Sequence, residues 1–107
     1  MTTENPYTVL RTDRASEHLN EILWYVHDAS GSSQAAIALL DCFEKAIARL
    51  SSFPKMGPVA RASNLARRGY RKLTIGAYLI LYKVDDEKQQ VIVHGVFHQC
   101  SDYEHLV

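Results

Sequence analysis

The residues best suited to chemistry are a guanidinium, an imidazole and a phenol in the C-terminal half of this 107-residue chain: Arg71, His98 and Tyr103. If the fold brings them together, the imidazole can carry protons while the guanidinium holds a phosphate, which is what acid–base cleavage of RNA requires. The competing interpretation is structural, with His98 ordering the C-terminal tail through a hydrogen bond. The choice depends on strand pairing, which the sequence leaves open.

Metal chemistry is not indicated. His94 and His98 lie four residues apart in one predicted strand and are expected to share a face of it. At ~3.3 Å per residue they are ~13 Å apart, too far to share a zinc ion, so we interpret His94 as a core or rim histidine. Cys42 and Cys100 lack the spacing of metal ligands, and Cys42 is predicted to be a small core residue of a helix. We expect no metal and no cofactor.

The charged residues are balanced in number but unevenly distributed. The chain has 12 basic and 12 acidic residues, yet no Asp or Glu occurs from Lys45 to Val84, where nine of the basic residues fall. This pattern indicates either a positive face that meets nucleic acid or an acidic partner, or simple solvation of a loop and a strand edge. The candidates for partner contact are Arg61, Arg67, Arg68, Arg71 and Lys72.

Most of these candidates lie in or beside a predicted three-stranded meander over residues 70–75, 78–84 and 90–98. The short connections between the strands indicate antiparallel pairing. The middle strand is apolar on both faces, with Leu79 and Leu81 on one face and Ile80 and Tyr82 on the other. Other parts of the chain must therefore cover both faces of the meander.

Two amphipathic helices precede the meander. The first is capped by Thr12 or Asp13 and breaks at residues 28–31, and the second is capped by Ser32 or Ser33 and ends before Pro54. The short link between them predicts an antiparallel hairpin whose apolar stripes need the surface of the sheet.

The remaining segments complete the predicted fold. Residues 7–11 are a short strand expected to pair with a sheet edge, residues 59–66 are predicted to be irregular, and Asp102 could cap a last helical turn. The element order predicts a single α+β domain over residues 1–107, β-α-α-β-β-β, with a helical hairpin on a mainly antiparallel four-stranded sheet. No apolar run approaches the ~18 residues of a membrane span and no signal peptide is indicated, so a cytoplasmic protein without membrane contact is expected.

Four segments, in this order along the chain, resemble the RelE/ParE superfamily of type II toxin–antitoxin toxins, also called plasmid stabilisation proteins. They are YTVLRTDRASEHLNEILWYV, FPKMG, GYRKLTIGAYLILYKVDDE and VFHQCSDY. The resemblance covers residues 7–103 and implies the fold described above. It also implies tight association with a cognate antitoxin that wraps the toxin, with a homodimer or a toxin–antitoxin heterotetramer as expected assemblies.

The superfamily has two main modes of action. RelE-like members cleave messenger RNA in the ribosomal A site without a metal, whereas ParE-like members poison DNA gyrase. The arginines of the RelE pattern in the middle strand and after the last strand correspond here to Leu79 and Gln99. The resemblance therefore favours the ParE-like mode and disfavours a nuclease. Two alternatives stay open: a ribosome-dependent endoribonuclease, with Arg71, His98 and Tyr103 as its catalytic residues, and a member that has lost toxicity but still binds its antitoxin.

Overall fold

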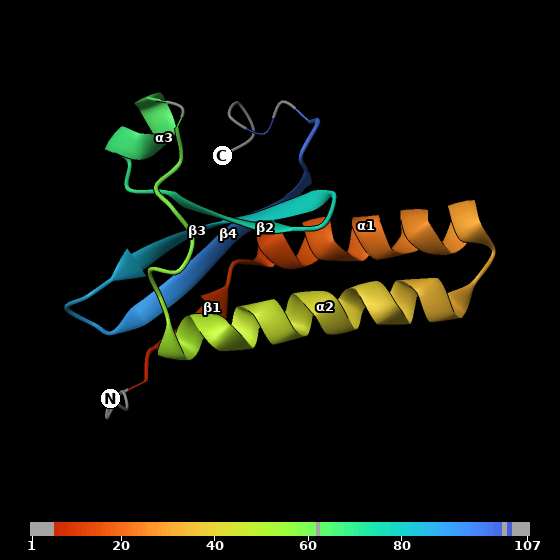
Figure 1. Ribbon diagram of the computed structural model, residues 1–107, viewed down its shortest axis with the longest axis horizontal. Helices are drawn as coiled ribbons and strands as arrows, with labels where there is room; N and C mark the ends of the chain where they lie inside the picture. Colours follow the sequence, from red (N-terminus) through yellow and green to blue (C-terminus); the bar gives the residue numbers. More distant parts are fainter. Residues whose placement is uncertain (1–5, 62, 102, 104–107) are drawn as a thin grey trace.

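The computed structural model of the chain describes residues 6–61, 63–101 and 103. Its elements are β1 (Thr8–Arg11), α1 (Asp13–Ser30), α2 (Ser33–Ser52), α3 (Ser63–Arg67), β2 (Arg71–Ile75), β3 (Tyr78–Asp85) and β4 (Gln90–His98). The strands form one sheet in the order β1-β4-β3-β2, in which β1 runs parallel to β4 and the other pairs are antiparallel (Figure 1). The predicted α+β arrangement, including the N-terminal strand at a sheet edge, is confirmed.

Helices α1 and α2 form the predicted antiparallel hairpin. The Thr12 side chain caps α1 by accepting a hydrogen bond from the Ala15 N–H at 3.0 Å, and Ser32 caps α2 in the same way. Helix α1 ends at Gly31, whose φ of 66° lies in the left-handed region that glycine adopts without strain. The hairpin projects well beyond the sheet at the end where the two helices are joined (Figure 1).

The main core lies between this hairpin and one face of the sheet, called here the hairpin face. Its fully buried members are Ala15, Leu19, Phe43 and Leu50 from the helices and Ile80, Tyr82, Val91, Val93 and Val96 from β3 and β4. Removing these apolar side chains from water is the main force that docks the hairpin on the sheet.

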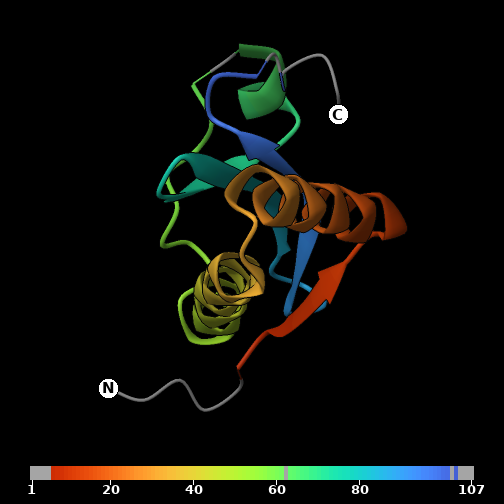
Figure 2. The same ribbon diagram turned by 90° about the vertical axis from the view of Figure 1, so that its right-hand side faces the viewer.

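A second, smaller cluster covers the other face of the sheet, called here the opposite face. Its buried members are Ala60, Leu65, Tyr70, Leu79, Leu81 and Phe97. Helix α3 brings Leu65 into this cluster, where its side chain is 0% exposed. In Figure 2, α3 lies at the top of the view and α2 at the bottom, with β3 and β4 between them. The prediction of irregular chain over residues 59–66 was wrong at its C-terminal end, because a five-residue helix is too short to show periodicity.

A β-bulge in β4 changes which side chains share a face. Leu81 pairs with Gly95 and Tyr82 pairs with Val93, so His94 is an extra residue opposite no partner. As a result His94 faces the same side as Phe97, while His98 pairs with Tyr78, which packs against the hairpin-face core. The prediction that His94 and His98 share a face was therefore wrong, because period-2 alternation fails across a bulge.

Cys42 also differs from the prediction. It is exposed and carries a free thiol, as does Cys100. The neighbouring Phe43 takes the fully buried position of this helical turn, and consecutive helical residues point about 100° apart. The predicted cap at Asp102 lies outside the described residues.

The loop after α2 is fastened to β2 and β3 by hydrogen bonds at Gly57. The Gly57 N–H donates to the Tyr82 hydroxyl at 2.9 Å, and the Arg71 guanidinium donates to the Gly57 carbonyl at 2.8 Å. The Lys72 N–H donates to the Pro58 carbonyl at 2.9 Å. Burial raises the pKa of the Tyr82 phenol, so its hydroxyl stays protonated and keeps its hydrogen-bonding role.

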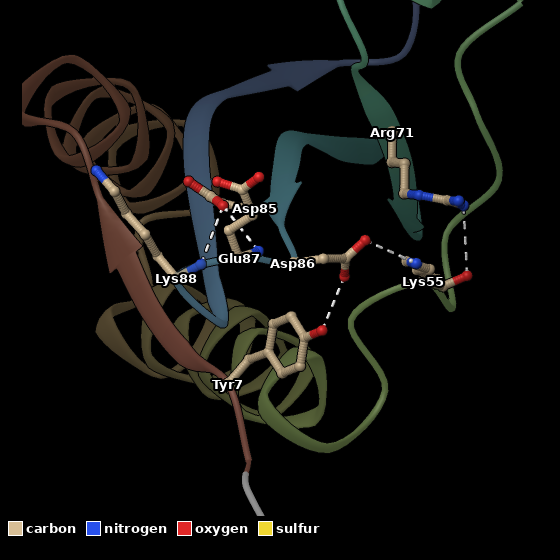
Figure 3. A network of polar contacts seen from close by, with 7 residues as sticks. All are labelled: Tyr7, Lys55, Arg71, Asp85, Asp86, Glu87 and Lys88. Atoms are coloured by element: carbon tan, nitrogen blue, oxygen red, sulfur yellow. Dashed lines mark hydrogen bonds and ion pairs between the residues drawn. The ribbon is translucent and has the colours of Figure 1, made fainter.

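A second set of polar contacts joins the same loop to the β3–β4 turn and to the N-terminal segment (Figure 3). Asp86 accepts hydrogen bonds from the Tyr7 hydroxyl at 2.8 Å and from the Lys55 ammonium at 3.0 Å. These two donors lower the pKa of Asp86 below its usual range, with the Tyr7 hydrogen bond as the larger cause. Three segments far apart in the sequence therefore meet at one carboxylate.

We predict that Gly57→Ala destabilises the protein by about 1–3 kcal/mol, the usual cost of forcing an extra methyl into a packed site. A Cβ there would lie 2.7 Å from the Lys72 carbonyl oxygen and 2.8 Å from the Tyr82 hydroxyl. Urea unfolding measures the change. In a Tyr82→Phe background the penalty should shrink, because one of the two clashing atoms is gone. An unchanged free energy of unfolding for Gly57→Ala would contradict the close approach of this loop.

Candidate functional site

Arg71, the predicted phosphate-binding residue, makes structural hydrogen bonds within the fold. It starts β2 and pairs with Tyr82, which places it on the hairpin face. Its guanidinium donates to the Gly57 carbonyl at 2.8 Å. It also reaches the Lys55 carbonyl at 3.5 Å (Figure 3). The side chain therefore holds the loop after α2 against the sheet.

His98 and Tyr103 lie on different faces. The His98 Nδ1 accepts the Cys100 N–H at 3.0 Å, which confirms the interpretation that this histidine orders the tail. Tyr103 stacks on Phe97 of the opposite face, with ring centroids 6.0 Å apart. His98 lies opposite Tyr78, and Tyr78 lies opposite Ile75, which is four residues from Arg71 along β2. At ordinary sheet spacings the Arg71 and His98 backbones are therefore ~16 Å apart. The structure does not bring Arg71, His98 and Tyr103 together.

At the two positions where the resemblance implies arginines, the side chains of this chain have structural roles. Leu79 is 1% exposed in the centre of the opposite-face cluster. Gln99 holds the β2–β3 turn, because its N–H donates to the Ala77 carbonyl at 2.9 Å and its side-chain amide donates to the Gly76 carbonyl. One position serves packing and the other serves the turn.

Cationic groups gather instead around Tyr70, at the edge of the opposite-face cluster. The Arg68 guanidinium lies 5.1 Å from the centroid of the Tyr70 ring, and the Lys83 ammonium lies 4.6 Å from it. The His94 ring meets Tyr70 edge-on at 5.4 Å. We call these four residues the Tyr70 cluster. Attraction between a cation and an aromatic ring favours these positions, and the Arg68 guanidinium also reaches the Tyr70 hydroxyl at 3.5 Å.

The imidazole of His94 is kept in its neutral form by this environment. Burial lowers the pKa of His94, and the positive charges of Lys83 and Arg68 lower it further. His94 is half-buried against Tyr70, which agrees with its interpretation as a core or rim histidine. Sequence reasoning missed Lys83 as a member of the site. The two-residue turn at Gly76 pairs Ile75 with Tyr78, and continuing that register places Tyr70 beside Lys83.

Most of the other predicted partner-contact residues lie on or beside the opposite face. Lys72 pairs with Leu81 and so points to that face. Arg61 and Arg67 are exposed on the segment that covers it. Arg71 is the exception, because it lies on the hairpin face. The arrangement sets cations around an apolar surface, which suits an anionic partner that also presents apolar groups.

Neither a metal site nor a membrane-spanning helix occurs within the part of the chain that the structure describes. No group of three or more His, Cys, Asp or Glu side chains there is placed to hold a metal ion. None of the helices described is both long enough and apolar enough to cross a membrane.

Comparison with known proteins places this fold and site in a family. Residues 9–103 match the model of the ParE toxin of the parDE type II toxin–antitoxin system. Toxin ParE1 of Mycobacterium tuberculosis is 35% identical over 95 residues, which cover 89% of this chain and 92% of that protein. The chain therefore belongs to the ParE toxin family and is the toxin component of a type II toxin–antitoxin system.

Solved structures agree with this assignment. The toxin–antitoxin complex RelBE2 of M. tuberculosis contains a chain that is 26% identical, with a TM-score of 0.63 over 94% of this chain and 100% of that one. The chromosomal ParDE system of P. aeruginosa has a chain with a TM-score of 0.71 at 14% identity, covering 86% of this chain and 95% of that one. At that identity the second likeness concerns the fold alone.

We predict that Lys83→Gln moves the pKa of His94 upward, because it removes a positive charge that disfavours the imidazolium. Titration of the His94 ring resonances by NMR measures the change. Lys88→Gln, in the exposed β3–β4 turn, removes the same charge elsewhere and is the matched control. A His94 pKa that falls, or that responds equally to both substitutions, would show that Lys83 does not lie beside the Tyr70 cluster.

Proposed function

We propose that this toxin acts in the cytoplasm as a ParE-like inhibitor of an essential protein, DNA gyrase, and that a cognate antitoxin neutralises it. The observation that carries the proposal is the buried position of Leu79. It lies where a RelE-like nuclease is expected to have an arginine, and it is packed among apolar side chains of the opposite face.

Phosphodiester cleavage requires charged groups fixed around one phosphate, because they must stabilise the charge that develops in the transition state. Here Arg71 is bound to the Gly57 carbonyl, His98 is bound to the Cys100 N–H, and Tyr103 stacks on the far side of the sheet from both. A toxin that acts by binding its target needs no such assembly, and this supports the gyrase proposal over the nuclease.

The opposite face is the proposed antitoxin contact. An acidic antitoxin segment with apolar anchors would find cations from Arg61, Arg67, Arg68, Lys72 and Lys83 around the exposed parts of that face. The M. tuberculosis RelBE2 structure, which is of a toxin–antitoxin complex, supports an antitoxin partner for this chain.

The experiment that tests the target uses the purified toxin in two assays. With purified gyrase and plasmid DNA, we expect enzyme-linked DNA breaks to accumulate and the antitoxin to prevent them. In a cell-free translation reaction, we expect no cleaved message on stalled ribosomes. Cleavage of message that His98→Ala abolishes would contradict the proposal and favour the endoribonuclease. If the toxin neither traps DNA breaks with gyrase nor cleaves message, yet still binds its antitoxin, the proposal is contradicted in favour of a non-toxic antitoxin-binding protein.

A further inference from the structure

A hollow of about 380 Å³ lies between α1 and the adjoining ends of β3 and β4. It is lined by Glu21, Ile22, Tyr25, Tyr78 and His98. We call it the α1 hollow. Tyr78 and His98 point to the hairpin face, so the α1 hollow is separate from the Tyr70 cluster and from the basic side chains of the opposite face.

The aromatic walls of the α1 hollow are of two kinds. The Tyr78 ring is held edge-on by Phe43 at 5.9 Å and by His98 at 5.3 Å, so its position is fixed by packing. The Tyr25 side chain, by contrast, is 70% exposed. The His98 ring is fixed in turn by its Nδ1, which accepts the Cys100 N–H at 3.0 Å. The lining therefore contains two rings fixed by packing, Tyr78 and His98, and one exposed ring, Tyr25.

Glu21 gives the α1 hollow its charge. It is the one charged residue in the lining, and within the described residues it makes no hydrogen bond or ion pair. Glu17 lies one helical turn before it, and like charges at this spacing disfavour a helix. Asp41 and Asp86, by contrast, are paired with Lys45 and Lys55. The exposed carboxylate of Glu21 is therefore available to an occupant of the α1 hollow.

Aromatic faces beside a carboxylate favour a cation, since the π faces attract positive charge and the carboxylate pairs with it. A nucleic acid strand is disfavoured, because the lining contains no Lys or Arg to hold a phosphate and Glu21 would repel one. Tyr25, 70% exposed, adds apolar surface to the lining of the α1 hollow. Aromatic anchors of this kind are typical of protein-binding surfaces.

We propose that the α1 hollow receives an arginine or lysine side chain, flanked by apolar residues, from the protein that the toxin inhibits. The antitoxin is expected to be acidic where it meets the opposite face, so a cation-binding hollow on α1 fits a different partner. The identity of that partner rests on the proposed function, whereas the chemistry of the α1 hollow does not.

The direct test titrates the ¹⁵N-labelled, antitoxin-free chain with the peptide acetyl-Leu-Arg-Leu-amide and follows the NMR spectrum. We expect saturable shifts at Glu21, Tyr25, Tyr78 and His98. Glu21→Gln should weaken binding about fivefold, the size of one exposed charge pair. Glu87→Gln makes the same charge change in the exposed β3–β4 turn and should have no effect.

Three outcomes of this titration would overturn the proposal. The first is an equal response to acetyl-Leu-Glu-Leu-amide, which would mean that charge is not recognised. The second is a response to guanosine monophosphate but not to the arginine peptide, which would identify a base-binding site. The third is no saturable shift with any of the three probes.

A second experiment tests the partner. Expression of Glu21→Lys without antitoxin should arrest growth at least about tenfold less than the wild-type chain or Glu87→Lys, while antitoxin affinity stays unchanged. A parallel loss of antitoxin affinity would assign the α1 hollow to the antitoxin and overturn the partner assignment. If wild-type toxin does not act on purified gyrase, the proposed target is wrong, but the peptide titration still decides what the α1 hollow binds.

Discussion

The structure depends on one constraint: β3 is apolar on both sides and must be covered on both. Its fully buried residues alternate between the two cores, with Ile80 and Tyr82 under the helical hairpin and Leu79 and Leu81 under the segment that contains α3. The long hairpin meets one half of this requirement. The other half is met by the segment after α2, which is fastened at Gly57 by Tyr82 and Arg71 and then runs along the β2 edge of the sheet to α3.

This constraint also shapes the chemistry that the fold offers. Apolar packing occupies the middle of the opposite face, so its cationic side chains lie around the rim, where Arg68 and Lys83 gather on the Tyr70 ring. Charges on a rim suit recognition of an acidic polypeptide, whereas cleavage of a phosphodiester needs them gathered at one point. Family membership and the buried position of Leu79 both support the proposed mode of action, in which the toxin acts by binding its target.

The sequence predicted the fold well because its strongest signals are local. Helical periodicity, the caps at Thr12 and Ser32, and the two-sided apolar pattern of β3 are each readable within a few residues. The failures concern features set by tertiary contacts. The bulge at His94 reverses the alternation of β4, α3 is too short to show a period, and Cys42 lies just outside the buried stripe of α2. The sequence identified most basic residues of the site. It did not predict that Arg68 and Lys83 meet at Tyr70, because that depends on the register between β2 and β3.

The central claim is that the segment containing α3 covers Leu79 and Leu81 on the opposite face. The most direct test is thiol labelling of single cysteines placed on that face, with Cys42 and Cys100 replaced by serine. Leu79 and Thr74 are cross-strand partners on this face, the first buried and the second exposed at the edge. We predict that Leu79→Cys reacts at least about 100-fold more slowly than Thr74→Cys, because its thiol becomes accessible only when the covering segment opens. Equal rates would show an open face at Leu79 and would contradict the account.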